Sequence, residues 1–509
     1  MRCVSSLIAL AGAVVCASSL ASASDGLRVA AWNISNYTGG NTAQVQTAVY
    51  ASFEGRSLAP DVLLLQEMRN ASAVNALVSA LNSAPGSPGD WAAAQTFVNS
   101  SINTGLIYRT SKVDLLDATL VDPGSGNPNQ PRNIVRYDLR LDGYASESAT
   151  IAAYPVHMKA GSGSTDQARR LNEANDILAD VATLPAERHA IFGGDTNIQS
   201  SSQAAHRALV GSSYNTGVFR DPIRTPGNWN NNGSFRFVHT QDPSGAGGMD
   251  DRHDQVLLEA SLVDGEGFDY IGNPAVAYST VTWDDPNHSY RSWGNDGSNF
   301  NGQIATTTNA MVGPDIAIAL RTLAGSGGHL PVFCDLRVPA VLSVEQATID
   351  LGEIPFGAAP GATVTVSNAG DTVLWGPAGI DDLDFTLATT AGLVAPGGSL
   401  SDNAGGPGVD VSVTFIDSAR PMGGPVSETL TIDSDAADAP SAQVTFTGTI
   451  VGCSPADLVT PFGQVDFFDV LEYLARFDAE DPSADLVAPF GSLDFFDVLE
   501  FLGQVGPCP

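Results

Sequence analysis

The sequence predicts an α/β domain over residues 24–337, an all-β sandwich over residues 338–452 and a small helical repeat pair over residues 453–509. In the first region, strand-like apolar runs alternate with helical spacing, whereas short alternating runs separated by Gly, Pro and Asp follow Pro339. A direct repeat with a period of 28 residues ends the chain. The length of 509 residues also corresponds to about three domains.

The first 23 residues have the pattern of a secretory signal peptide. Arg2 supplies the positive start, Leu7–Cys16 is an apolar core, and Ala21-Ser22-Ala23 is a cleavage site. A membrane anchor is the alternative, but this apolar stretch and every later one are shorter than the ~18 residues that a membrane span needs. We therefore expect a secreted or cell-surface protein after cleavage, without a transmembrane segment.

The α/β prediction for residues 24–337 depends on four strand-like runs and one helical pattern. The apolar runs are Leu27–Trp32, Asp61–Leu65, Thr150–Val156 and Ala190–Phe192. Between the last two runs, apolar residues of the segment 166–183 recur at helical spacing and share one face. These elements alternate along the chain as in one large α/β domain.

The regular spacing of short strands after Pro339 predicts a β-sandwich. The alternating runs lie at residues 347–351, 363–367, 409–415, 428–432 and 443–448. We find no polar residues that converge in this region, which favours a spacer or adhesion role.

The repeat at the end of the chain consists of two loop-helix units. Residues 457–463 recur as 485–491, and residues 466–472 recur as 494–500 with the pattern of an amphipathic helix. Because neither unit can bury its Phe and Leu face alone, we expect the two copies to pack on each other.

The cysteines are few and separate into two kinds. Cys453 and Cys508 bracket the repeat segment, and we expect a disulfide between them in an exported protein. Cys334 lies in an apolar run, so we expect it to be a buried small hydrophobe.

The formal net charge of −33 is divided unevenly along the chain. Residues 24–337 carry 20 Lys and Arg against 31 acids, the sandwich region one Arg against 14 acids, and the tail one Arg against 11 acids. This balance argues against a bulk nucleic-acid-binding surface. The basic residues lie almost entirely in the α/β domain, where an anionic substrate would need them.

Seven polar residues of the first domain lie directly beside strand-like runs: Asn33, Glu67, His157, Asp195, Asn197, Asp254 and His329. Side chains at the carboxyl ends of strands converge at one edge of a layered sheet. Carboxylates, amides and imidazoles together fit a hard divalent cation with acid-base groups around a phosphate.

The segments that hold these residues resemble the endonuclease/exonuclease/phosphatase superfamily, the metal-dependent phosphohydrolases related to DNase I. The matching segments occur in the family's order: Trp32-Asn33, Leu65-Gln66-Glu67, His157, Gly193-Gly194-Asp195-Thr196-Asn197, Arg252-His253-Asp254 and Gly328-His329-Leu330-Pro331-Val332. The resemblance covers residues 27–337. It implies a four-layered α/β sandwich that hydrolyses phosphoesters with Mg²⁺ or Mn²⁺.

The resemblance also implies a role for each polar residue. Glu67, helped by Asn33, would hold the metal. Asp195 would activate or orient the attacking water, and Asn197 would position that water and the phosphate.

The remaining three residues would handle the phosphate and the protons. His157 would contact the phosphate or help protonate the leaving oxygen. His329 would bind the scissile phosphate or transfer a proton. Asp254 would bond to His329, fixing its tautomer and raising its basicity.

One position departs from the family pattern. The superfamily usually has Asp directly before the last His, and Gly328 occupies that position here. A metal ligand is therefore missing, which Asp250 or Asp251 would have to replace. Five histidines match no family position and are expected to be structural: His189, His206, His239, His253 and His288. Arg252 is expected to be an ion-pair partner.

Two further resemblances concern the regions after residue 337. The sandwich resembles the immunoglobulin-like modules of exported bacterial proteins. The tail resembles a dockerin, whose two EF-hand-like repeats bind Ca²⁺ and dock onto a partner. Leu458, Thr460 and Phe462 occupy early ligand positions of such a loop, which favours a calcium-independent helix pair over a Ca²⁺ site. In either case we expect residues 453–509 to dock onto a partner or the cell surface.

The combined prediction is a secreted, divalent-metal-dependent phosphoester hydrolase. The first expectation is an extracellular nuclease or phosphodiesterase that acts on DNA, RNA or a small phosphodiester. The alternatives are a phosphomonoesterase or lipid phosphodiesterase of the same fold, or a degenerate, non-catalytic surface-binding protein because of Gly328.

Overall fold

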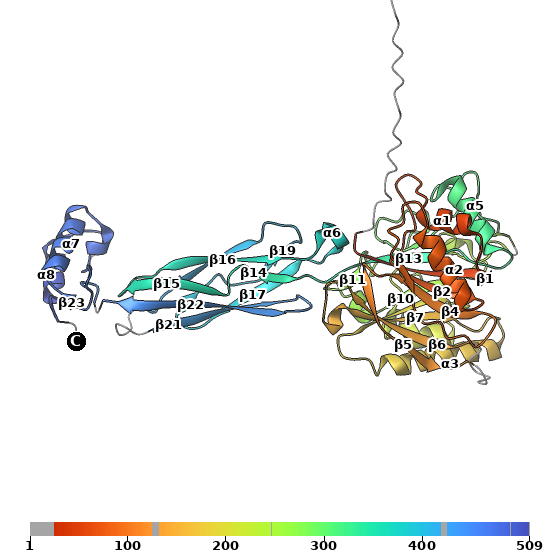
Figure 1. The fold of residues 1–509 in the computed structure, drawn as a ribbon, viewed down its shortest axis with the longest axis horizontal. Coiled ribbons are helices and arrows are strands. Elements are labelled where there is room, and N and C mark those ends of the chain that lie inside the picture. The colour runs from red at the N-terminus through yellow and green to blue at the C-terminus, as the bar shows by residue number, and fades with distance from the viewer. Residues whose placement is uncertain are drawn as a thin grey trace, which may run out of the picture.

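The computed structural model describes residues 25–124, 132–245, 247–418, 425–452, 454–488 and 490–507. The expected signal peptide and the expected disulfide between Cys453 and Cys508 fall on residues outside these ranges. Along the chain, an α/β domain, a β-sandwich and a helical tail follow one another in an extended arrangement (Figure 1).

The first sheet of the α/β domain has seven strands. Six of its strands lie in the order β11-β13-β1-β2-β4-β3. The seventh strand, β12, also pairs with β13. The strands are β1 (Leu27–Tyr37), β2 (Val62–Met68), β3 (Trp91–Ala93), β4 (Asn103–Arg109), β11 (Asp269–Tyr270), β12 (Arg291–Ser292) and β13 (Val332–Arg337).

The second sheet has six strands in the order β5-β6-β7-β8-β10-β9. These strands are β5 (Val113–Asp122), β6 (Ile134–Leu141), β7 (Thr150–His157), β8 (His189–Asp195), β9 (Phe219–Arg220) and β10 (Asp254–Glu259). The four strands predicted from apolar runs are β1, β2, β7 and β8, so their existence is confirmed.

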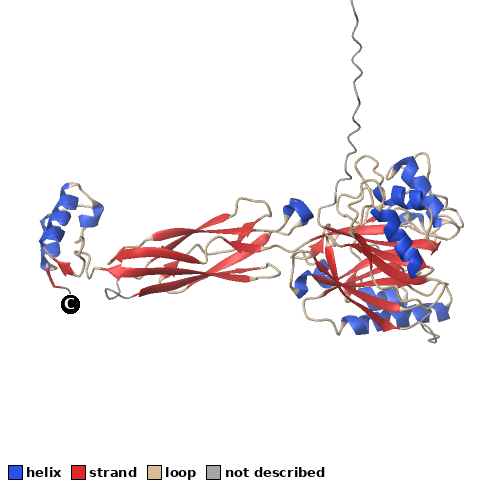
Figure 2. Cartoon of the chain, viewed as in Figure 1, coloured by secondary structure: helices blue, strands red, loops and turns tan. Residues whose placement is uncertain are grey.

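Helices cover the outer face of each sheet (Figure 2). The first sheet carries α1 (Thr42–Tyr50), α2 (Ala71–Asn82) and α5 (Gly313–Ala324), and the second carries α3 (Ser164–Val181) and α4 (Ala204–Val210). The predicted helix over residues 166–183 is α3. Single 3-10 turns occur at η1 (Glu147–Ala149), η2 (Gly233–Phe235) and η3 (Ala260–Leu262).

The alternation of side chains along each strand builds the layers. In β1, Val29 and Ala31 face the core between the two sheets, whereas Ala30 and Trp32 face the helices. In β8, Ile191 likewise joins the central core and Phe192 joins the core beneath α3 and α4. The order of layers is therefore helix, sheet, sheet, helix, and the α/β prediction is confirmed.

Strand direction brings several strand ends to one edge of this sandwich. β1 runs parallel to β2, and β7 runs parallel to β8, so the carboxyl ends of each pair lie together. β10 runs antiparallel to β8, and its first residue, Asp254, pairs with the last residue of β8, Asp195. β13 runs antiparallel to β1, so the segment preceding β13 reaches the same edge.

The described part of residues 338–452 forms two sheets around one apolar core. One sheet contains β14 (Leu342–Val344), β16 (Gly361–Asn368), β18 (Leu393–Val394) and β20 (Val409–Phe415). The other contains β15 (Thr348–Pro355), β17 (Leu383–Thr389), β19 (Leu400–Asp402), β21 (Pro425–Ser434) and β22 (Ser441–Val451). The five predicted alternating runs lie within β15, β16, β20, β21 and β22, with one residue of the first run before β15. The resemblance of this β-sandwich to immunoglobulin-like modules stays a prediction.

The sandwich is joined to the α/β domain by packing as well as by the chain. Trp375, from the short helix α6 (Thr372–Trp375), and Ile380, after η4 (Pro377–Gly379), belong to the central core of the α/β domain. The Trp375 carbonyl accepts from the Gly26 amide at 2.6 Å, and the Lys112 ammonium lies 4.4 Å from the Trp375 ring centroid. The junction therefore lies at the amino-terminal end of β1.

The tail contains β23 (Gln464–Val465), α7 (Phe467–Asp478), η5 (Pro482–Ala484), α8 (Phe495–Gly503) and β24 (Gly506–Pro507). The two copies pack on each other through Tyr473 and Phe501, whose rings stack at 4.0 Å. The exposed faces of α7 and α8 instead carry Phe467, Phe468 and their counterparts. The prediction that the two copies pack on each other is confirmed. The contact, however, buries Tyr473 and Phe501, whereas the Phe pairs at the helix starts stay exposed.

Candidate active site

The structure brings six of the seven predicted site residues into one connected group at the edge where the strand ends meet: Asn33, Glu67, His157, Asp195, Asp254 and His329. All except Glu67 are almost fully buried. The seventh, Asn197, lies beside the group and is described below.

Asn33 bridges the two carboxylates at the centre of the group. Its Nδ2 donates to Oδ2 of Asp195 at 3.0 Å and to Oε1 of Glu67 at 3.3 Å. Its Oδ1 accepts from the Ser35 amide at 3.0 Å, which fixes the side chain. The bridge holds a carboxylate from each sheet against one amide.

Backbone geometry aims Glu67 at this edge. Glu67 has a φ of 60°, in the left-handed region, where the register between β2 and β4 shifts. Such a bulge re-aims a side chain at a strand end, and a left-handed non-glycine residue is typical of functional sites. The Asn36 amide donates to Oε2 of Glu67 at 2.8 Å and holds the carboxylate there.

Gly194 allows β8 to pack closely against Val156 and the Gln66 side chain directly before Asp195. Its φ of 141° is unusual for a side-chain-bearing residue, and a Cβ there would overlap the Val156 carbonyl oxygen and lie 2.6 Å from Nε2 of Gln66. The Gly193-Gly194 pair is therefore a steric requirement for placing Asp195 against Asn33.

His157 lies against Asp195 as a neutral imidazole. Its Nε2 is 3.3 Å from Oδ2 of Asp195 and 3.9 Å from Oε1 of Glu67. Burial outweighs the attraction of Asp195 and lowers the pKa of His157 to about 3. The ring can therefore exchange neutral hydrogen bonds but carries no charge near neutral pH.

His329, unlike His157, has a raised pKa. Its Nδ1 lies 2.7 Å from Oδ2 of Asp254 and 3.8 Å from Oδ2 of Asp195. Burial acts to lower the pKa of His329, but Asp254 and Asp195 together raise it to about 10. Asp254 is itself held by the Thr240 hydroxyl at 2.5 Å. His329 is thus a buried cation with a fixed counter-charge.

Asp195 remains ionised between these rings. Burial acts to raise its pKa, but the neighbouring His329, His157 and His253 hold it well below the usual value. The Asn197 amide donates to Oδ1 of Asp195 at 3.1 Å. The Asn197 side chain donates to the Met158 carbonyl at 3.1 Å, so in this structure it braces the loop after β7.

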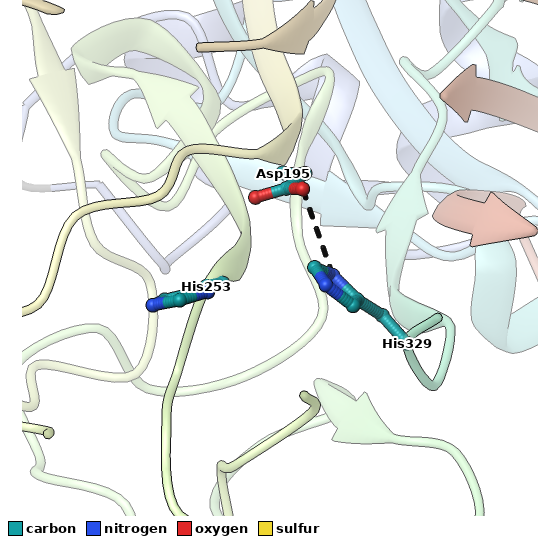
Figure 3. Close-up of side chains that lie close together, drawn as sticks. All are labelled: Asp195, His253 and His329. Atoms are coloured by element: carbon teal, nitrogen blue, oxygen red, sulfur yellow. Dashed lines mark ion pairs between the residues drawn. The ribbon is translucent and has the colours of Figure 1, made fainter. Parts of the chain in front are cut away.

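His253 lies beside this group. A ligand atom of its ring lies within 4.8 Å of one from each of Asp195 and His329 (Figure 3), and its expected structural role stays a prediction. Burial lowers its pKa. The sequence signal was present, since His253 directly precedes Asp254, but no family position marks it.

Arg132 is a second residue that sequence reasoning missed. Its guanidinium donates to the carbonyls of His157 and Met158 at 2.9 and 3.0 Å, and its charge contributes to the low pKa of Asp195. Arg132 lies just before β6, which runs antiparallel to β7. Residues 134–141 are not among the predicted strand-like runs, so no predicted element placed the preceding arginine at this edge.

The other four unassigned histidines make contacts of the structural kind expected. Three of them hydrogen bond: His189 to Ser261 and Ser148, His239 to the Trp229 carbonyl, and His288 to the Tyr270 hydroxyl. His206 and His288 pack against aromatic rings.

Arg252 pairs with Asp221 through two hydrogen bonds of 2.8 Å, which confirms its expected structural role. Both side chains are fully buried. Because Asp221 neutralises the guanidinium of Arg252, this residue adds no net positive charge to the site.

Gly328 has no room for the side chain that the family usually places there. A Cβ would overlap the carbonyl oxygen of Ala324 and lie 2.8 Å from Cβ of Ser35. The local packing therefore leaves no space for an Asp side chain at residue 328. Of the residues expected to compensate, Asp251 lies 3.8 Å from His253 but is held by the Asn230 amide, at 3.0 Å to each oxygen.

The group has the properties of a site for a divalent cation. Several buried polar atoms in the described structure have no hydrogen-bond partner: Nδ1 of His157, both ring nitrogens of His253 and Oδ1 of Asp254. Buried polar atoms are normally satisfied, so such atoms at one edge indicate a missing group. Glu67 and Asp195 offer the oxygen ligands that Mg²⁺ and Mn²⁺ use.

The comparison with protein families decides the assignment. The sequence profile described as "Endonuclease/Exonuclease/phosphatase family" matches residues 30–406, about three quarters of the chain. The chain belongs to the endonuclease/exonuclease/phosphatase family. Members of this family hydrolyse phosphoesters and commonly use divalent metals.

Solved structures and curated proteins give less detail. The chain is similar to D. rerio TDP2 complexed with a single-strand DNA product, at 14% identity over 61% of this chain and 99% of that chain, with a TM-score of 0.34. It is also similar to the human Nocturnin catalytic domain with bound sulfate, at 15% identity over 61% and 93%, with a TM-score of 0.34. An endonuclease/exonuclease/phosphatase from Beutenbergia cavernae gives 13% identity over 84% and 100%, with a TM-score of 0.33. No curated protein sequence matches the chain.

Within the endonuclease/exonuclease/phosphatase family, this member combines the expected carboxylate and imidazole pairs with an altered last motif. Across the described ranges, no helix has the length and apolarity of a membrane span. The candidate site therefore carries the motif residues of the resemblance except at residue 328, where Gly stands in place of the usual Asp.

Proposed function

We propose that this chain is a divalent-metal-dependent phosphodiesterase, secreted after removal of residues 1–23, which cleaves nucleic acid or a small phosphodiester. The observation that carries the proposal is the His329–Asp254 ion pair beside Asp195. It places a buried cation 3.8 Å from an ionised carboxylate, next to Glu67 and Asn33.

Glu67, with Asn33 and Asp195 beside it, would hold the cation. A bound divalent ion would supply Lewis-acid stabilisation of the charge that grows on the phosphoryl oxygens. The low pKa of Asp195 makes it a hydrogen-bond acceptor that orients an attacking water, rather than a strong base.

The imidazoles divide the remaining work. His329, charged near neutral pH, would bind the phosphate and give a proton to the leaving oxygen, and Asp254 would hold it in position. His157, which is neutral, would donate a hydrogen bond to a phosphate oxygen. Arg132 holds the backbone of His157 and so fixes the ring's position.

The charge distribution favours a substrate held by few phosphates. The first domain has a net charge of −11, so it lacks the broad positive field of a protein that tracks along a duplex. A short or single-stranded nucleic acid or a small diester therefore fits better than a long processive grip.

Hydrolysis assays on the purified full chain test the proposal. The substrates are bis-p-nitrophenyl phosphate, p-nitrophenyl phosphate, plasmid DNA and sphingomyelin, each with EDTA, Mg²⁺ or Mn²⁺. We expect metal-dependent cleavage of the diester and of DNA. Glu67→Gln and His329→Gln should each reduce the rate on the order of a hundredfold or more.

Two matched variants control for folding and for general charge effects. Glu54→Gln changes the same residue type at an exposed site, and His189→Gln does so at the far end of β8. Both should keep the wild-type rate. Absence of metal-dependent turnover on every substrate would contradict the proposal and favour the degenerate, non-catalytic alternative that Gly328 raises.

A second role, docking, is favoured by the exposed faces of the tail. Phe467, Phe468, Phe495 and Phe496 are each 62–67% exposed, and large apolar patches of this kind mark interaction sites. The tail also carries 11 acids and one Arg. We infer a partner at the cell surface whose apolar patch is rimmed by basic residues.

Cell fractionation tests the docking role. Wild type should be retained with the cell envelope, whereas the variant with all four Phe changed to Ser should appear in the medium. Val373→Ser, which removes a single exposed apolar side chain from α6, should behave as wild type. Equal distribution of wild type and the quadruple variant would exclude this surface as the anchor.

A further inference from the structure

We propose that Arg170 is a positioning residue for His157: from helix α3 it holds the backbone of residues 157–161 and thereby keeps the His157 ring against Asp195. The inference deepens the proposed function, on which it rests, because His157 is the residue proposed there to donate a hydrogen bond to a phosphate oxygen. Three observations support it.

The first observation is that the buried face of α3 begins with charged side chains. The residues that this helix buries are Arg170, Glu173, Ala174 and Ile177. Their spacing places them on one face, where apolar side chains are the rule. Arg170 is fully buried. Burying a charge is costly unless the group is hydrogen-bonded, so the contacts of Arg170 show what its burial achieves.

The second observation concerns what the Arg170 guanidinium contacts. Its Nη1 donates to the carbonyl oxygens of Lys159 and Gly161 at 2.5 and 2.8 Å, and its Nη2 donates to Oε1 of Gln203 at 3.0 Å. Gln203 directly precedes α4, so one side chain ties α3 and the start of α4 to the segment that follows β7. Hydrogen bonds from a charged donor are stronger than neutral ones. Arg170 therefore fixes the backbone two and four residues beyond His157.

The third observation is that other groups hold the beginning of the same segment. Arg132 donates to the carbonyls of His157 and Met158 at 2.9 and 3.0 Å, and the Met158 amide donates to the Asp195 carbonyl at 2.9 Å. A connection after a strand usually lies on the surface and is more mobile than the strand. Here two arginines bind the carbonyls at residues 157, 158, 159 and 161, which restrains the backbone that carries the ring.

Glu173 joins the two arginines into one cluster beneath the segment. It follows Arg170 by three residues on the same face of α3 and is 5% exposed. Burial raises the pKa of Glu173, whereas Arg132, a hydrogen bond from the Lys159 amide and Arg170 oppose the shift. The carboxyl group is therefore close to both guanidiniums and to the backbone that they hold.

The expected effect of Arg170 on the reaction passes through His157. The hydrogen bonds that Arg170 makes in the described structure go to the two carbonyls and to Gln203, and none goes to a residue of the candidate site. Nε2 of His157 lies 3.3 Å from Oδ2 of Asp195. A misplacement of about 1 Å by a distant substitution can cost about 10²-fold in rate.

A double-mutant cycle on the full chain tests this route, with bis-p-nitrophenyl phosphate and Mn²⁺. Arg170→Leu should reduce the rate of diester hydrolysis by about 10–100-fold. In a His157→Gln background the same change should cost less than about twofold, because the ring that Arg170 positions has been removed. In a His329→Gln background it should keep its full effect. A general loss of structure would instead lower the rate by the same factor in both backgrounds.

Two further variants separate the guanidinium from its charge and from its helix. Arg170→Lys keeps the charge but loses the planar fork that reaches two carbonyls and Gln203, so it should recover only part of the rate. Arg169→Leu makes the matched change one position earlier on α3, at a partly exposed residue outside the buried face. It should keep the wild-type rate.

Hydrogen exchange followed by mass spectrometry gives a readout that is independent of activity. Arg170→Leu should speed exchange in the peptide that covers residues 157–163 and leave α7 of the tail unchanged. Thermal denaturation shows whether this variant is folded. If it is not, Arg170→Lys takes its place in the cycle and in the exchange experiment.

The outcomes separate this inference from the proposed function. Equal losses of rate in the wild-type and His157→Gln backgrounds would overturn the inference and leave the phosphodiesterase standing. Unchanged exchange in residues 157–163 would also overturn it. Faster exchange there, with no hydrolysis of any substrate by the wild type, would support the holding of this segment by Arg170 and overturn the proposed function.

Discussion

Nδ1 of His329 lies 2.7 Å from Oδ2 of Asp254, although His329 precedes β13 of the first sheet and Asp254 begins β10 of the second. The ion pair therefore joins the two sheets at the edge of the sandwich. The two side chains are almost inaccessible to solvent. Removing one member leaves the other as an unpaired buried charge, which is strongly unfavourable.

Asp254→Asn should reduce the rate of diester hydrolysis by about 10²-fold or more, because His329 loses the group that keeps it charged and oriented. It should also lower the free energy of unfolding by about 3–5 kcal/mol. Steady-state kinetics and thermal denaturation measure both effects. Thr240→Val, which removes only the hydroxyl that supports Asp254, should change the rate by no more than a few-fold. A wild-type rate for Asp254→Asn would rule out this role for the pair.

Glu173→Gln should flatten the pH dependence of stability. Burial raises the pKa of Glu173 from 4.5 to about 8, although Arg132 and Arg170 oppose the shift. A raised folded-state pKa contributes stability that is complete below the unfolded value and is lost as the pH rises through the folded value. Between about pH 5 and 8, wild type should therefore lose up to about 1.4 kcal/mol per pH unit relative to the variant.

Chemical denaturation of both proteins at pH 5, 6, 7 and 8 measures this difference. Other titrating groups cancel in the comparison, because the two chains differ at one position. Parallel curves for wild type and Glu173→Gln would show that the carboxyl is not perturbed. Glu187→Gln, at a solvent-exposed glutamate after the same helix, is the matched control.

Gly328→Ala should lower the free energy of unfolding by about 1–3 kcal/mol, because the added methyl group overlaps the Ala324 carbonyl. Gly328→Asp should therefore fail to restore a metal ligand in the usual family position. Gly397→Ala makes the same change where no atom lies within 4 Å of the new Cβ, so it should be neutral. Equal stability for the two alanine variants would contradict this account of the missing Asp.

Asp469→Ala should loosen the first loop-helix unit of the tail. Oδ1 of Asp469 accepts from the amides of Leu458 and Val459 at 2.6 and 2.8 Å, and Oδ2 accepts from the Asp466 amide at 2.8 Å. Hydrogen exchange followed by mass spectrometry should show faster exchange in α7. The equivalent unit around Asp497 is intact in this variant, so α8 is an internal reference. Unchanged exchange in α7 would show that the carboxylate does not hold the loop.

Much of the fold could be predicted from the sequence, because the local pattern of apolar residues indicates the longer strands and helices. The buried runs that became β1, β2, β7 and β8 are apolar on both faces, which is expected for strands between two layers. The helix α3 and the strand β20 were also found within a residue or two. Short strands such as β9 and β12 carry no comparable pattern, since two residues show no periodicity.

The site was predictable where a residue follows a parallel strand, because strand direction alone places its side chain at the shared edge. Arg132 and His253 escaped this reasoning. Arg132 precedes β6, a strand that the sequence analysis does not predict, and both ring nitrogens of His253, like those of His206, lack hydrogen-bond partners in the described structure. Neither property can be read from sequence spacing.

The same limit explains the tail. The repeat predicted that two similar units pack together, but the sequence did not indicate which apolar residues form the contact. Tyr473 and Phe501 lie on the inner sides of α7 and α8, so the Phe pairs at the helix starts remain outside. Only the relative placement of the two helices decides between these sets.

The position of Trp375 in the core of the first domain determines how the whole molecule would present its site. The Gly26 amide that bonds to Trp375 directly precedes β1, whereas Asn33 lies toward the opposite end of that strand, roughly 20 Å away at about 3.3 Å per residue. The β-sandwich is therefore joined to the α/β domain at the end of β1 opposite the candidate site. A molecule held by its tail would turn its catalytic edge outward, away from the attachment point, toward substrates arriving from the surroundings.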